Sequence, residues 1–224
     1  MASPQGRCAT FSSDADGYAP SEGVVAFVIK TRAAALHDGD RILGIIKASS
    51  VQHNGRSQGL VAPNVRAQIS LQRHLLKKSM LSPSNIQYVY LCCYTTTINL
   101  VRFIEAHGTG TKIGDLLEMQ GICEVFDSSH DSSDPLIIGA SKTCVGHTES
   151  AAGLVGIVKA LLSFKYHMVP GLVHLSADNL NPEIDCGSVP LVVPWRNTPL
   201  KPNESEPGHA MVLSVFRSAV SNYC

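Results

Sequence analysis

Two glycine-flanked histidines at the ends of apolar runs constrain this sequence more than any other feature. The first lies in Glu105-Ala-His-Gly-Thr-Gly-Thr111, and the second ends Ser141-Lys-Thr-Cys-Val-Gly-His147. Glycine lets a backbone turn tightly and approach a ligand closely. Open α/β sheets carry their ligand sites where strands end. The pattern therefore predicts an α/β fold in which the two histidines meet in one pocket; the alternative is two loop histidines with local hydrogen bonds only.

Charge and length exclude several classes of protein. The chain has 224 residues with 18 basic and 18 acidic side chains, which indicates one domain or two small ones. Scattered, balanced charge argues against a nucleic-acid or membrane surface. The longest apolar stretches, Val89–Ile104 and Ala151–Phe164, fall short of the roughly 20 residues that span a bilayer. Seven cysteines without a CxxC pair, and a polar start, predict a reduced, cytoplasmic protein.

In the first part of the chain, apolar runs alternate with turn residues. We expect buried strands at Val24–Lys30 and Ile42–Ala48, separated by a short helical turn at Arg32–Leu36. Asn64 is a suitable cap for a helix from Val65 to about Met80, since its apolar residues recur on one face.

The same alternation continues after the first histidine. Asp115 can cap a helix over Leu116–Phe126, and Leu136–Ala140 should be a strand that leads to Lys142. A helix from Ala151 through Phe164 begins with small residues that allow close packing. Further on, the apolar runs predict a short edge strand at Leu191–Trp195 and a last core strand that begins in Ala210–Phe216.

These segments together resemble a known family. The patterns E-A-H-G-T-G-T-x-x-G-D and S-K-T-x-x-G-H-x-E-S-A-A-G are similar to the paired histidine motifs of β-ketoacyl synthases, in particular ketosynthase domains of type I polyketide synthases and animal-type fatty acid synthases. G-R-C-x-x-F-x-x-x-A-D-G-Y and G-R-S-x-G-L-x-A-P-N fit the same family. The resemblance runs from about Gly6 to Trp195, with a weak continuation to Phe216. It implies a thiolase-like αβαβα layered fold, here the C-terminal half plus the tail of the N-terminal half.

The resemblance also suggests a division of the chain. Residues 1–39 would be the tail of the N-terminal half, residues 40–170 the C-terminal ketosynthase domain, and residues 171–224 an extension whose end lacks the family's Gly-Phe-Gly-Gly loop. Ketosynthases usually pass from the equivalent of Val89 directly to Glu105. Residues 90–104 are therefore predicted to be a non-family insertion, either an error of the gene model or a segment that loops out.

The family joins an acyl thioester to a malonyl thioester, which loses carbon dioxide, on the phosphopantetheine of acyl carrier protein. The resemblance implies that His107 and His147 donate N–H groups to the oxygen on which charge develops. It makes Lys142 an electrostatic partner in the site, with Glu149 as its candidate counter-ion. The alternative for this pair is a solvated ion pair that contributes little.

Three further side chains take roles from the resemblance. Thr109 and Thr111 would bind the phosphopantetheine arm, although threonine also serves turns. Glu118 would have a structural role on the helix that follows. Cys144 stands where the family usually has asparagine, and its thiol is a weaker hydrogen-bond donor.

The family's nucleophilic cysteine lies in a D-T-A-C-S-S elbow upstream of the matching segments. None of the seven cysteines has that context: Cys8, Cys92, Cys93, Cys123, Cys144, Cys186 and Cys224. The chain alone is therefore expected to lack condensing activity.

The resemblance implies no directly bound cofactor. Its expected partners are acyl carrier protein, other synthase domains and a second copy in a homodimer. Two other interpretations stay open. One is a metal site from Cys144, His147, Cys92 and Cys93, which lacks paired ligand spacing. The other is a non-catalytic fragment that acts by interaction through an exposed apolar face.

Overall fold

A parallel sheet lies at the centre of the molecule. The structure is a computed structural model that describes residues 2–53, 64–81, 101–126, 130, 132–187, 189–200 and 209–214. Among these residues, four parallel strands pair in the order β4-β2-β1-β6. The strands are β1 (Val101–Glu105), β2 (Leu136–Gly139), β4 (Leu191–Val192) and β6 (His209–Val212). Because β1 and β2 are parallel, the histidine loops that follow them begin at the same edge of the sheet.

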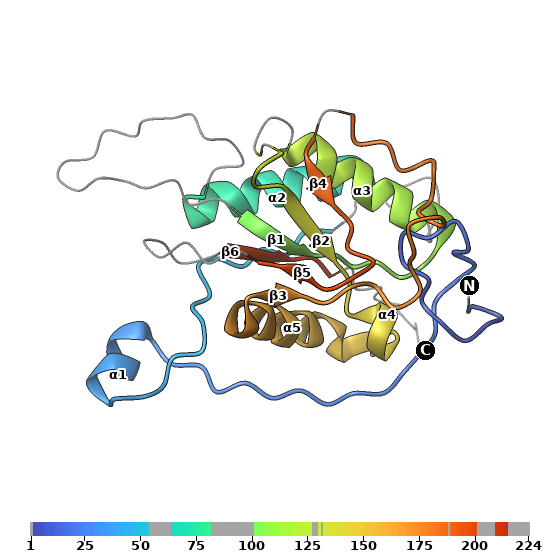
Figure 1. Ribbon diagram of the computed structural model, residues 1–224. Coiled ribbons are helices and arrows are strands. Elements are labelled where there is room, and N and C mark those ends of the chain that lie inside the picture. The colour runs from blue at the N-terminus through green and yellow to red at the C-terminus, as the bar shows by residue number, and fades with distance from the viewer. Residues whose placement is uncertain are drawn as a thin grey trace, which may run out of the picture.

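Helices cover both faces of this sheet (Figure 1). The helices α2 (Val65–Ser79) and α3 (Lys112–Phe126) lie on one face, and α5 (Ala152–Tyr166) lies on the other. Shorter elements are α1 (Arg32–His37), α4 (Lys142–Val145), the 3-10 turn η1 (Glu149–Ala151) and the antiparallel pair β3 (Met168–Val169) and β5 (Thr198–Pro199). No helix of the described residues is both long and apolar enough to cross a membrane.

The apolar residues form a core on each side of the sheet. The larger core joins α2 and α3 to the sheet and includes Ile69, Ile122 and Phe126. The smaller core includes Phe103 of β1 and Ala160 of α5. The buried face of α5 consists of small residues, as its sequence indicates: Ala152, Gly156, Ala160 and Ser163. This helix therefore lies close against the strands that carry the site.

The predicted insertion ends too late in the sequence. Residues Val101–Ile104 belong to β1, at the centre of the sheet, and Val101, Phe103 and Ile104 are at most 1% exposed. Two apolar runs precede Glu105, and the sequence pattern favoured the first of them as the strand. Pairing with β2 and β6 selects the run that is joined directly to Glu105. The rest of the predicted insertion, residues 90–100, lies outside the described residues.

Most of the predicted helices are confirmed, with one wrong cap. The Asn64 side chain accepts a hydrogen bond from the Ala67 N–H at 3.2 Å, as expected of an N-cap. The helix α3, however, begins at Lys112, so Asp115 lies within it. The Asp115 carboxylate accepts the N–H groups of Phe11 (2.8 Å) and Gly110 (3.1 Å) instead. A long-range use of this side chain overrides its capping preference.

The two expected strands before residue 50 are wrong for the described structure. Val24–Lys30 and Ile42–Ala48 are extended but unpaired, in an arm (residues 21–53) that runs away from the layered body (Figure 1). Val24 is 99% and Val28 is 98% exposed. A strand needs a neighbour for its N–H and C=O groups, and no described segment supplies one. The short helical turn between them is confirmed as α1.

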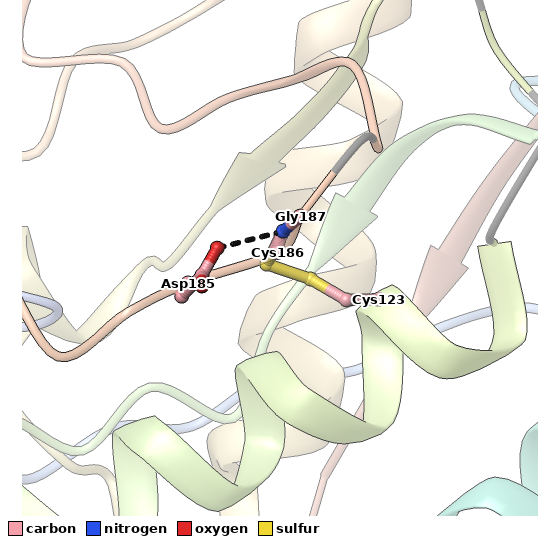
Figure 2. Close-up of a disulfide and its surroundings, with 4 residues drawn as sticks. All are labelled: Cys123, Asp185, Cys186 and Gly187. Carbon is pink, nitrogen blue, oxygen red and sulfur yellow. Dashed lines mark hydrogen bonds between the residues drawn. A yellow bond between two sulfur atoms is a disulfide. The ribbon is translucent and has the colours of Figure 1, made fainter.

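A disulfide joins two cysteines that are distant in the sequence (Figure 2). Cys123 of α3 is bonded to Cys186, with 5.4 Å between their Cα atoms. Beside it, the Asp185 carboxylate accepts a hydrogen bond from the Gly187 N–H at 2.8 Å. The prediction of reduced cysteines is therefore wrong for this pair. No spacing motif marks it, because only packing of a distant segment against α3 brings the two residues together.

Candidate active site

The two histidine loops meet at the carboxyl ends of β1 and β2. The ring centroids of His107 and His147 are 5.3 Å apart, and the ring planes are nearly perpendicular, at 84°. The predicted convergence of the two histidines is thus confirmed, while their chemical roles stay predictions.

The first loop is held by carboxylates of the helix that follows it. Glu118 is 5% exposed; its Oε1 accepts the His107 N–H at 2.6 Å and its Oε2 accepts the Gly108 N–H at 2.8 Å. Gly110 has a φ of +79°, and a Cβ there would lie 2.7 Å from the backbone nitrogen of Ala9. This loop therefore requires both the carboxylate and the glycine.

The second loop is held by main-chain bonds to the N-terminal segment. The His147 N–H donates to the Ala19 carbonyl at 2.7 Å, and the Ser21 N–H donates to the His147 carbonyl at 2.9 Å. The Nδ1 atom of His147 accepts the Glu149 N–H at 3.1 Å. In a neutral imidazole this leaves the proton on Nε2, which is then free to donate.

Tyr18 is a site residue that the sequence reasoning missed. Its ring centroid lies 5.3 Å from that of His147, with 61° between the ring planes. The available signal was its position in the A-D-G-Y pattern, which matched the family without suggesting a contact with the second histidine.

Burial and one lysine set the charge of the site. Lys142 is 4% exposed; burial lowers its pKa, and the carboxylates of Glu118 and Glu105 oppose this. Burial, followed by the charge of Lys142, lowers the pKa of His107 well below its ordinary value. The same two causes lower the pKa of His147. Both histidines are therefore neutral near neutral pH, and a neutral imidazole still has one N–H to donate.

The expected pairing of Lys142 with Glu149 is not found. Glu149 is exposed, beyond the turn at Gly146, and the ion pairs of the described residues do not include it. The carboxylates that act on Lys142 are Glu118 and Glu105, which α3 and β1 bring together. This depends on tertiary contacts, whereas Glu149 was chosen because it is near in the sequence.

The two threonines of the first loop lie side by side. Their Oγ1 atoms are 3.2 Å apart, and a Cβ on Gly114 would lie 2.3 Å from the Thr111 hydroxyl. Both hydroxyl groups are thus near the start of α3. Binding of a phosphopantetheine arm by Thr109 and Thr111 stays a prediction.

The buried thiol beside the site is Cys8. The Ala19 N–H donates to its sulfur at 3.3 Å, and burial raises its pKa. Because a thiolate is the reactive form, this environment does not favour a nucleophile. Among the described residues, no three His, Cys, Asp or Glu side chains are grouped as metal ligands.

The layered parallel sheet and the two converging histidines define a thiolase-like domain. Residues 43–99 and 94–176 match the family model of the β-ketoacyl synthase C-terminal domain, and residues 1–35 match that of the N-terminal domain. The chain belongs to the β-ketoacyl synthase family. The family match includes residues 94–104 of the predicted insertion, and the domain division at residues 39 and 170 stays a prediction.

Named relatives and solved structures agree with this family. The chain is 53% identical to hispidin synthase of Neonothopanus nambi over all of its length, and 39% identical to tenellin synthetase of Beauveria bassiana over 96% of it. The ketosynthase from module 6 of the bacillaene synthase of Bacillus subtilis shares 30% identity over 95% of this chain, with a TM-score of 0.81. An oxazolomycin ketosynthase domain of Streptomyces albus shares 32% over 94%, with a TM-score of 0.79.

The chain is short beside these proteins. It spans 12% of hispidin synthase and 5% of tenellin synthetase, and it covers 35% and 34% of the two solved ketosynthase chains. The predicted thiolase-like fold and the family resemblance are confirmed by these matches.

Proposed function

We propose that this chain forms the two-histidine part of a polyketide ketosynthase site, in which a malonyl thioester loses carbon dioxide and condenses with an acyl thioester. The observation that carries the proposal is the pair of neutral imidazoles, His107 and His147, with ring centroids 5.3 Å apart at the strand ends. The similarity to hispidin synthase supports polyketide chemistry. The substrates would be carried on the phosphopantetheine of acyl carrier protein, next to other synthase domains and in a homodimer.

The two imidazoles suit the decarboxylation step. When the bond between the carboxylate and the α-carbon breaks, its electron pair forms an enolate, and negative charge develops on the thioester oxygen. Fixed N–H donors aimed at that oxygen stabilise the charge. His147 can donate from Nε2, because its Nδ1 accepts the Glu149 N–H. The buried ammonium of Lys142 adds a positive field beside both rings.

The condensation step needs a further group. The enolate carbon attacks the carbonyl of an acyl thioester, a carbon–carbon bond forms, and the thiolate of the acyl-carrying cysteine leaves. In the family that cysteine precedes the segments found here, and the described Cys8 has a raised pKa. We therefore assign to this chain the decarboxylation half of the reaction. Thr109 and Thr111 would bind the phosphopantetheine arm near the first histidine.

Release of labelled carbon dioxide tests the proposal. The full chain is incubated with a malonyl-pantetheine thioester labelled in its free carboxyl group. His107→Ala and His147→Ala should each lower kcat by about 10²-fold or more, as does loss of an oxyanion donor elsewhere. His37→Ala, on the exposed helix α1, is the matched control and should release carbon dioxide as the parent does. No release by the parent, or equal release by the two site variants, would contradict the proposal.

A second candidate is a chain that acts only by binding a partner. The observation in its favour is the arm, whose Val24, Val28 and Val51 are at least 98% exposed. Large exposed apolar patches mark interaction surfaces. Sedimentation of the chain, followed by the same carbon dioxide assay on each fraction, separates the two candidates. A monomer that decarboxylates the thioester argues against a purely binding role.

A further inference from the structure

A buried carboxylate links the elements that carry the two histidine loops. Glu105 is the last residue of β1 and is 1% exposed. Its Oε1 accepts the Ser141 N–H at 2.5 Å, at the start of α4. Its Oε2 lies 2.8 Å from the Nζ of Lys159, on α5. One side chain thus joins the end of β1, the start of α4 and the helix beneath the sheet.

The surrounding backbone leaves room for this pair. A Cβ on Gly139 would lie 2.7 Å from the Lys159 Nζ, and a Cβ on Gly156 would lie 3.1 Å from the Cγ of Glu105. The ammonium of Lys159 also lies 5.6 Å from the centroid of the Phe103 ring. The side chains of Lys159 and Glu105 are only 12% and 1% exposed. A pair that is this well enclosed interacts more strongly than a solvated surface pair.

The pair lies directly behind the proposed site. Glu105 precedes His107 by two residues, and Ser141 is followed by Lys142. The negative charge of Glu105 also acts on Lys142, where it opposes the effect of burial. Any movement of the carboxylate would therefore shift one histidine loop relative to the other.

We propose that the Glu105–Lys159 ion pair is a positioning element that sets the separation of the His107 and His147 rings. Neither residue touches the substrate in this arrangement; both act through the loops that they join. The effect on kinetics rests on the proposed function, but the effect on ring separation does not.

The test compares Lys159→Met, Glu105→Gln and the double variant in the full chain. Lys165→Met is the matched control, because Lys165 is exposed on the same helix. The nuclear Overhauser effect between the two imidazole rings should weaken in all three variants and stay unchanged in the control. Because small misplacements of reacting groups are costly, kcat for malonyl-pantetheine decarboxylation should fall about 10-fold or more, with KM within about twofold. The double variant should resemble either single variant, since the two residues act as one unit.

The outcomes separate the two proposals. If the parent chain releases no carbon dioxide, the proposed function fails, and the ring-to-ring signal still decides this inference. A folded Lys159→Met chain with parental ring contact and kcat would overturn it. If Lys159→Met does not fold, Glu105→Asp and Lys159→Arg replace it. The aspartate is too short to reach both partners and should weaken the ring contact, whereas arginine keeps the charge and should preserve it; equal behaviour of these two would also overturn the inference.

Discussion

The two histidine loops reach one site by different means. The first is held by its own sequence neighbourhood, because Glu118 lies on the helix that directly follows it and accepts two of its N–H groups. The second is held by the main chain of Ala19 and Ser21, more than a hundred residues earlier. The first loop is thus a local unit, whereas the second takes its shape from a distant segment. Changes to side chains should damage the first loop, and changes to backbone geometry should damage the second.

Glu118→Ala should produce the largest effect and would test the side-chain half of this contrast. It leaves the buried N–H groups of His107 and Gly108 without acceptors, and each unsatisfied buried donor costs about 1–3 kcal/mol. The free energy of unfolding should fall by about 3 kcal/mol or more, measured by urea denaturation. Glu124→Ala on the same helix, where Glu124 pairs with Arg73 at the surface, should change it by less than about 0.5 kcal/mol. Equal effects of the two variants would remove the special role of Glu118.

Gly146→Ala tests the backbone half. Gly146 has a φ of +73° and a ψ of −172°, and a Cβ there would lie 2.9 Å from the Ala19 carbonyl oxygen. Such a conformation is essentially confined to glycine, so the substitution should cost about 2 kcal/mol or more in the free energy of unfolding. Gly6→Ala is the control, with a φ of +64° and open space around the site, and should cost roughly 1 kcal/mol. A cost for Gly146→Ala no larger than that of Gly6→Ala would show that the close approach is unimportant.

The charge of Lys142 links the two loops, and Lys142→Met should raise the pKa of both histidines. Burial is the larger cause of their lowered pKa and remains, but the positive charge is lost. The pKa of each ring is read from its proton chemical shift during a pH titration. Lys77→Met, on the exposed side of α2, should leave both values unchanged. Unchanged histidine pKa values in Lys142→Met would contradict the electrostatic assignment.

The lowered histidine pKa values also fix a sign for stability. In the unfolded chain these histidines bind protons below about pH 6.5, while the folded state still excludes them. Their contribution to the free energy of unfolding is therefore complete above that pH and is lost as the pH falls below it.

Cys144→Asn should have the smallest effect and would sharpen the contrast. Cys144 is exposed in the second loop, where the family usually has asparagine. If main-chain bonds hold this loop, the substitution should change the free energy of unfolding by less than about 0.5 kcal/mol. A gain of more than about 1 kcal/mol in thermal or urea denaturation would mean that this side chain matters to the loop after all.

Local signals in the sequence predicted the parts of the structure that depend on neighbouring residues. The Asn64 cap, the helix near Ala152–Tyr166 and the strand at Leu136–Gly139 are confirmed, and the edge strand is confirmed in a shorter form at Leu191–Val192. Each follows from a cap, an apolar period or a run of β-branched residues. The meeting of His107 and His147 was also predictable, because parallel strands end at one edge of a sheet.

Long-range pairing defeated the sequence in the remaining cases. A strand at Val24–Lys30 has the right composition, but composition does not supply the neighbour that a strand requires. The carboxylate partners of Lys142 come from β1 and α3, and no spacing indicates them. Tyr18 approaches His147 only because residues 19–21 pair with the second loop. In the site, the sequence thus indicated which residues matter better than it indicated what holds them.

The Cys123–Cys186 bond makes a closed ring of covalent links around the second histidine. Lys142, His147 and the whole of α5 lie between the two cysteines, which are 63 positions apart. A protease that cuts the chain once inside this ring leaves both pieces attached to each other. The nicked molecule would keep its full mass on a non-reducing gel and would split into two bands after treatment with a reductant. A cut outside the ring would release a fragment under either condition.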